Sequence, residues 1–187
     1  MPVQKQVADL LTIIRTLLAI LLLWLGLKQG SAGLSAAVLV LILAWTSDIL
    51  DGPLARRSQA PRQTWVCDHD LQADVILSTG LLAYMAFAGY WNLLVAGTYA
   101  LFWALVFRLQ GLDKTLGSLF QSVIYGSFIW VALREAPAYG RWLLAWITGA
   151  IVLTWPRFPR VLVPEFLANM RRLLAGHRST QNQHNNC

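Results

Sequence analysis

The chain has 187 residues, 57% of them hydrophobic and 13% charged, and its formal net charge is +6. An average soluble domain has about 25% charged residues, so this composition excludes an ordinary soluble protein and predicts an all-α, polytopic membrane protein. The basic residues are not interleaved with aromatic ones as on a nucleic-acid-binding surface. We therefore expect no nucleic acid as a partner, and anionic membrane lipids as neighbours of the positive charge.

Apolar runs of about 20 residues, the length that crosses a bilayer as a helix, recur along the chain. In chain order they predict six transmembrane helices over residues 8–27, 33–55, 69–88, 91–109, 115–133 and 139–156. The connecting loops are short, so consecutive helices are expected to lie antiparallel. Residues 1–160 are predicted to form one membrane domain. An amphipathic surface helix is expected over 161–176, followed by a disordered polar tail over 177–187.

Basic residues are divided unevenly between the two ends of the predicted helices. With the N-terminus inside, the inner side holds eleven and the outer side three, which is a positive-inside bias. The inner set is Lys5, Arg56, Arg57, Arg62, Arg108, Lys114, Arg157, Arg160, Arg171, Arg172 and Arg178. The outer set is Lys28, Arg134 and Arg141. This distribution predicts an integral protein of the bacterial inner membrane, with its aspartate-rich loop end facing the cytoplasm.

Four aspartates stand near the inner ends of the second and third predicted helices. Asp48 and Asp51 are three residues apart, and Asp70 and Asp74 are four apart, so each pair lies on one face of a helix. An ionisable group at membrane depth is costly and marks a functional site. Four close carboxylates also repel one another unless a cation neutralises them, and carboxylate oxygens suit Mg²⁺, Mn²⁺ or Ca²⁺. The pattern therefore predicts a metal site shared by two helices.

Two residues beside the aspartates indicate phosphate chemistry. Gly52 leaves room for a ligand to approach the backbone, and Arg56 presents a planar fork of donors that matches a phosphate. Together with metal ions they favour a reaction of a phosphate ester or anhydride. Two alternatives stay open: acids at helix ends near water, and a cation transporter, which would place its acids nearer the middle of a span.

This stretch resembles the signature of the CDP-alcohol phosphotransferase family, which is D-x-x-D-G-x-x-A-R followed by G-x-x-x-D-x-x-x-D. The matching residues are Asp48, Asp51, Gly52, Ala55, Arg56, Asp70 and Asp74. Weaker matches to other family motifs lie at residues 8–15 and 118–121. The chain departs from the signature at Val66, where the family has glycine, and in a loop before Val66 that is one residue longer.

The resemblance implies an enzyme that transfers a phosphatidyl group from CDP-diacylglycerol to an alcohol acceptor and releases CMP, in phospholipid biosynthesis. It implies two Mg²⁺ or Mn²⁺ ions and a homodimer. The implied metal ligands are Asp48, Asp51, Asp70 and Asp74. Asp74 is also the implied general base, which makes it the catalytic residue. The residues implied to line the nucleotide are Gly52, Ala55 and Arg56.

The acceptor is less defined than the donor. Glycerol 3-phosphate is our first expectation, with inositol phosphate, serine and phosphatidylglycerol as alternatives. Arg108 and Lys114 flank the loop between the fourth and fifth predicted helices, and they either bind the phosphate of the acceptor or only follow the positive-inside rule. Arg15, inside the first helix, either reaches a lipid phosphate or snorkels to the surface. Val66 leaves open a catalytically inactive membrane scaffold of the same family.

Overall fold

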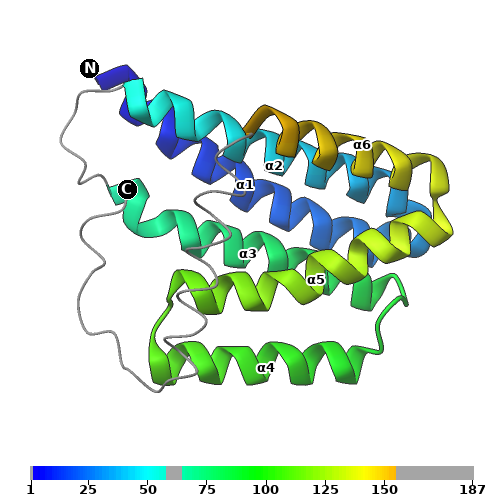
Figure 1. The fold of residues 1–187 in the computed structure, drawn as a ribbon. Coiled ribbons are helices and arrows are strands. Elements are labelled where there is room, and N and C mark those ends of the chain that lie inside the picture. The colour runs from blue at the N-terminus through cyan, green and yellow to red at the C-terminus, as the bar shows by residue number, and fades with distance from the viewer. Residues whose placement is uncertain (1, 58–64, 155–187) are drawn as a thin grey trace. The chain divides into compact units, whose positions relative to one another are not determined.

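The computed structural model describes the backbone over residues 2–57 and 65–154, and the side chains over 13–47, at 49 and over 71–153. The prediction of an all-α fold is confirmed: the described backbone forms helices, with no strand among the described residues (Figure 1). In chain order the elements are α1 (Pro2–Gln29), the 3₁₀ turn η1 (Gly30–Gly33), α2 (Leu34–Arg57), α3 (Trp65–Phe87), α4 (Leu93–Gln110), α5 (Lys114–Glu135) and α6 (Pro137–Thr154).

The chain divides into two units, Met1–Leu143 and Leu144–Cys187, with the boundary inside α6. The first unit contains α1–α5 and the start of α6, and the packing below refers to it. In the second unit the structure describes the end of α6, where Val152 and Leu153 are exposed. The predicted surface helix over 161–176 and the polar tail over 177–187 lie outside the described residues.

Helices α1 and α3 make the closest packing in the first unit. A Cβ built on Gly80 would lie only 2.7 Å from the Ala19 carbonyl oxygen, and one built on Gly26 would lie 3.0 Å from the Tyr84 Cα. Because glycine has no side chain, the two backbones can approach to this distance. Leu22 and Leu77 are fully buried in the same core. The chain order of these contacts shows that α1 and α3 run parallel, with α2 as the connection between them.

Two tyrosines, one near the C-terminal end of α3 and one just after it, contact the turn between α1 and α2. The Tyr84 hydroxyl donates to the Gly30 carbonyl at 3.2 Å, and the Tyr90 hydroxyl to the Ser31 carbonyl at 3.4 Å. Burial, with a smaller effect of the Glu135 carboxylate, raises the pKa of Tyr90. The Tyr90 hydroxyl therefore stays protonated, and able to donate, throughout the physiological range.

Aromatic side chains fill the space between α4 and α5. The Tyr99 and Phe120 rings stack with their centroids 5.7 Å apart, and the Tyr99 hydroxyl donates to the Phe120 carbonyl at 2.8 Å. Trp103 and Phe107 pack on the same Phe120 ring. The other side of α4 carries apolar residues that are more than half exposed, namely Leu93, Leu94, Leu101, Leu105 and Leu109. Such a surface suits contact with lipid tails.

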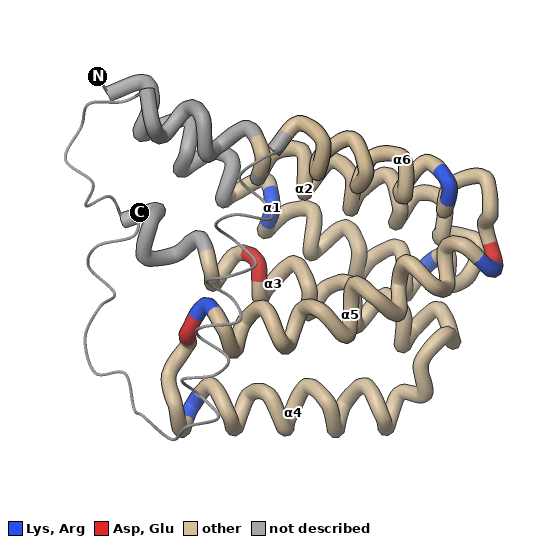
Figure 2. The backbone as a smooth tube through the Cα atoms, in the orientation of Figure 1, with Lys and Arg blue, Asp and Glu red and all other residues tan. Residues whose placement is uncertain are grey.

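Helix length and composition agree with a membrane protein. Among the described residues, three stretches are long and apolar enough to cross a bilayer: Ile13–Ser47, Leu93–Gln110 and Lys114–Glu135. The first continues through η1 and so includes most of α1 and α2. Leu71–Phe87 in α3 is a shorter apolar helix. Figure 2 shows long parts of the helices without a charged residue. Helices occupy all six predicted positions, while six separate membrane spans stay a prediction.

Candidate functional site

The predicted aspartate pairs both lie on helices. Asp48 and Asp51 belong to α2, near its C-terminal end, and Asp70 and Asp74 belong to the first half of α3. The helical spacing on which the predicted metal site depends is therefore present in the backbone. The side chains of Asp48, Asp51 and Asp70 lie outside the described ones, and so do those of Gly52, Ala55, Arg56 and Val66. Asp74 is described in full.

Asp74 forms an ion pair with Arg15. The Arg15 Nη1 donates to the Asp74 Oδ1 at 3.1 Å, and this contact joins α1 to α3. The Arg15 side chain is 1% exposed and the Asp74 side chain 31%. A buried guanidinium is costly without a negative partner, and the carboxylate supplies one. Part of the Asp74 side chain still remains accessible.

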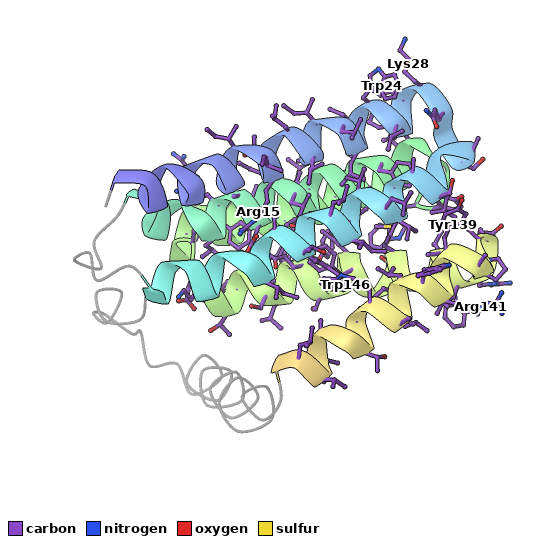
Figure 3. All side chains as sticks on the ribbon, turned by 90° about the horizontal axis from the view of Figure 1, so that it is seen from above. Arg15, Trp24, Lys28, Tyr139, Arg141 and Trp146 are labelled. Carbon is purple, nitrogen blue, oxygen red and sulfur yellow. The ribbon has the colours of Figure 1, made fainter. Side chains whose placement is uncertain are left out.

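The Arg15 guanidinium therefore contacts a carboxylate of the protein, whereas the sequence predicted that it would reach a lipid phosphate or the membrane surface. It is too buried for its charge to reach the membrane surface, and the charged group that it contacts belongs to the protein. In Figure 3 Arg15 lies within the bundle, whereas Lys28 projects from the C-terminal end of the same helix. The sequence marks Arg15 as a charge inside the first helix and as the end of a weak motif match over residues 8–15. Its pairing with Asp74 depends on α1 and α3 being neighbours.

The backbone around Asp74 has its own support. The fully buried Ser78 hydroxyl lies 2.9 Å from the Asp74 carbonyl and 3.0 Å from the Val75 carbonyl. This hydroxyl is thus satisfied within α3, one turn after the aspartate. Hydrogen bonds of this kind to the preceding turn often accompany a slight bend of the helix.

Helix α5 contacts both of the helices that carry aspartates. On α3, Leu71 Cδ1 would lie 2.8 Å from a Cβ built on Gly117. On α2, the Trp45 ring meets the Tyr125 ring edge-to-face with centroids 5.1 Å apart. Gln121 lies between these two contacts on α5. Among the described side chains, its Nε2 is one of the atoms shielded from solvent without a hydrogen-bond partner.

Arg108 and Lys114 lie on either side of the turn between α4 and α5. Arg108 is in the last turn of α4, where a positive charge complements the helix dipole. Lys114 is the first residue of α5, which Asp113 caps by accepting a hydrogen bond from the Thr115 amide at 3.2 Å. Both basic side chains are exposed. A role in binding an acceptor phosphate stays a prediction.

The predicted metal site falls mostly on side chains that are not described. Within the described part, no three His, Cys, Asp or Glu side chains come together, and three of the four predicted ligands lie outside it. The donor set itself fits a hard divalent cation, because all four groups are carboxylates. The partial exposure of Asp74 fits the same role, since a carboxylate must keep an accessible oxygen to bind an ion.

Comparison with known proteins gives a match to a protein family. The model of the CDP-alcohol phosphatidyltransferase family matches residues 5–155, which include all four aspartates together with Arg15 and Gln121. Neither the curated proteins nor the solved structures gave a match. The family is one of phosphotransferases, which move a substituted phosphate from a CDP-alcohol to an acceptor. The matched region covers most of the chain and every residue of the predicted site, and the chain belongs to the CDP-alcohol phosphatidyltransferase family.

Proposed function

We propose that this protein transfers a phosphatidyl group from CDP-diacylglycerol to an alcohol, with glycerol 3-phosphate as the first candidate acceptor, and releases CMP. The observation that carries the proposal is the family match over residues 5–155, with four aspartates at helical spacing inside it. The apolar helices support a donor whose lipid tails stay in the bilayer. The positive-inside bias supports an active site on the cytoplasmic side of a bacterial inner membrane.

Asp48, Asp51, Asp70 and Asp74 are the residues that would hold two Mg²⁺ or Mn²⁺ ions. When bound, such ions supply neutralising charge to a pyrophosphate and to departing CMP. Gly52 and Ala55 would let the nucleotide approach the α2 backbone, and Arg56 would pair with one of its phosphates.

Asp74 is the proposed general base. Its carboxylate would take the proton of the acceptor hydroxyl, and the hydroxyl oxygen would form a bond to the phosphorus that carries the diacylglycerol. The anhydride bond between the two phosphates would break, and its electron pair would leave with CMP. Arg15 contacts Oδ1 of Asp74 at 3.1 Å and so would fix the direction in which the carboxylate points. General-base catalysis contributes on the order of 10²–10⁴-fold in rate.

The test is CMP release by the purified protein from labelled CDP-diacylglycerol, with Mg²⁺ or Mn²⁺ and a panel of alcohols. We expect release with at least one acceptor. Asp51→Asn and Asp70→Asn should each reduce it by at least about 10²-fold, because each removes a metal-binding charge. Asp113→Asn is the matched control: it removes a carboxylate outside the site, and asparagine caps a helix equally well. Full activity in Asp51→Asn would exclude the two-metal assignment.

Val66 favours one competing proposal, an inactive scaffold of the same family. If the Val66 side chain blocks the nucleotide, Val66→Gly should raise CMP release from near zero. If the protein is active as it stands, the same substitution should leave release similar or lower, since the longer loop before Val66 supplies slack for a shifted backbone. A parent and a Val66→Gly variant that are both inert with every acceptor would exclude the transferase proposal.

A further inference from the structure

Gln121 lies one helical turn from each of two contacts that α5 makes with its neighbours. Four residues before it, Gly117 packs against Leu71 of α3. Four residues after it, the Tyr125 ring meets Trp45 of α2 at 5.1 Å. The residues 117, 121 and 125 therefore follow one line along α5, and this line passes between α2 and α3.

The same contacts fix the depth of Gln121. Helices α3 and α5 run parallel, as the contact between Ser127 and Met85 further along confirms, so one turn beyond Leu71 leads to the level of Asp74. Helix α2 runs antiparallel to α5, so one turn beyond Trp45 leads to the level of Asp48. Gln121 thus lies level with one aspartate from each of the two predicted pairs.

The Gln121 side-chain amide has no hydrogen-bond acceptor among the described residues. Its Nε2 is buried, and no described residue accepts a hydrogen bond from it. Burying an amide donor without an acceptor is unfavourable, and few buried polar groups in folded proteins lack a partner. The neighbouring α5 hydroxyls differ in this respect: Ser122 and Ser127 each donate to a carbonyl within the helix. An amide nitrogen donates hydrogen bonds and cannot ligate a cation, so it needs an oxygen acceptor, and an oxygen that carries negative charge forms the stronger bond.

We infer that Gln121 is a substrate-binding residue whose Nε2 donates a hydrogen bond to a phosphate oxygen at the aspartate site. This inference rests on the proposed function, which brings phosphates to that depth. Two sources can provide the oxygen: the pyrophosphate of the CDP-linked donor, or the phosphate of an acceptor such as glycerol 3-phosphate. The ligand would supply an acceptor that no described residue provides, and the amide is then kept at a cost to the stability of the empty protein.

The test compares Gln121→Leu and Gln121→Glu with the parent protein. Leucine removes the donor at similar volume, and glutamate replaces it with an acceptor of negative charge. Ser122→Ala is the matched control, because it removes a polar group from the exposed side of the same helix. The KM values for CDP-diacylglycerol and for glycerol 3-phosphate are measured separately, together with the melting temperature of the empty protein in detergent.

We expect both Gln121 variants to raise one KM by about 10- to 100-fold, the effect of losing a hydrogen bond to a charged group. A rise for CDP-diacylglycerol assigns the bond to the pyrophosphate, and a rise for glycerol 3-phosphate assigns it to the acceptor. The melting temperature of Gln121→Leu should equal or exceed that of the parent. Values of both KM within twofold of Ser122→Ala, or a Gln121→Leu protein that melts several degrees lower, would overturn the inference.

A binding measurement separates this inference from the proposed function. If the parent releases no CMP with any acceptor, the transferase proposal fails, and binding is followed by the rise in melting temperature on adding CDP or glycerol 3-phosphate with Mg²⁺. A rise that is present in Ser122→Ala and lost in Gln121→Leu supports the role of Gln121. Equal rises in the two variants, or no rise in the parent, refute it.

Discussion

At the scale of single residues, Arg15 and Asp74 each limit what the other can do. The guanidinium is 1% exposed and contacts the carboxylate at 3.1 Å. Asp74 therefore has a structural partner in addition to its proposed catalytic role. Replacing it affects the folded protein before any substrate is bound.

We predict that Asp74→Asn lowers the stability of the empty protein, because it removes the negative charge beside a buried guanidinium. The expected loss is about 1–3 kcal/mol, below the roughly 3–5 kcal/mol typical of fully buried pairs, since the Asp74 side chain is 31% exposed. The measurement is thermal or denaturant unfolding in detergent. Asp113→Asn should change stability little.

The pairing itself is checked by a double-mutant cycle. Arg15→Gln combined with Asp74→Asn should destabilise less than the sum of the two single substitutions, with a coupling of about 1–3 kcal/mol. Strictly additive losses would mean that the contact at 3.1 Å contributes nothing to folding.

At the scale of helices, the packing of α1 on α3 positions the ion pair. Both helices carry a small residue at their closest point, where Gly80 meets Ala19. Membrane helices commonly associate through such residues, because small side chains let two backbones approach. Arg15 lies one turn before Ala19, so the distance between the helices also sets the distance between guanidinium and carboxylate.

We predict that Gly80→Ala destabilises the protein by about 1–3 kcal/mol. The new Cβ would lie 2.7 Å from the Ala19 carbonyl oxygen, and a backbone atom cannot move aside as a flexible side chain can. Gly97→Ala on α4 is the control, since no atom beyond its chain neighbours and its own helix backbone lies within 4 Å of its built Cβ. That change should be neutral or stabilising by up to about 1 kcal/mol, because alanine favours helix. Similar melting temperatures for the two variants would contradict the close approach.

At the scale of the whole molecule, two connections at the same end of the first unit are linked to one another. Tyr84, in the last turns of α3, donates to the Gly30 carbonyl, and Tyr90, in the loop after α3, donates to the Ser31 carbonyl. The turn between α1 and α2 and the loop between α3 and α4 therefore lie on the same side of any membrane that the helices cross. This agrees with the side assigned by the distribution of basic residues.

We predict that single cysteines at Lys28 and Gly89, introduced after Cys67 and Cys187 are replaced by serine, are labelled from outside intact cells. A cysteine at Gln59 should be labelled only after the membrane is opened, because it belongs to the loop predicted to be cytoplasmic. Labelling of Gln59 from outside would reverse the orientation and move the proposed site away from cytoplasmic CDP-linked donors.

The sequence predicted where each helix lies along the chain, but it predicted the first residues of the helices less accurately. The predicted helix over 115–133 begins one residue earlier in the structure, directly after Asp113, and the helix over 91–109 begins two residues later, directly after the cap Asn92. Hydropathy follows apolar content, whereas a helix begins where a side chain can accept from its first amides.

The contacts between helices that are not consecutive could not be predicted from the sequence. Short loops indicate that consecutive helices are neighbours, but they do not indicate that α1 packs against α3. The pairing of Arg15 with Asp74 and the depth of Gln121 both follow from contacts between helices that are not consecutive. The pattern of the aspartates, in contrast, was visible because it lies within two helices, where spacing alone determines the face.

Arg15 and Asp74 are separated by 59 positions along the chain. During synthesis the guanidinium is therefore made well before the carboxylate that it contacts. An unpaired arginine costs about 2.5–3.5 kcal/mol at the centre of an inserted helix and less toward its end, so we expect the first helix to be less stable in the bilayer while the third is still absent. We therefore expect α1 to become most stable in the membrane only after α3 has been inserted beside it.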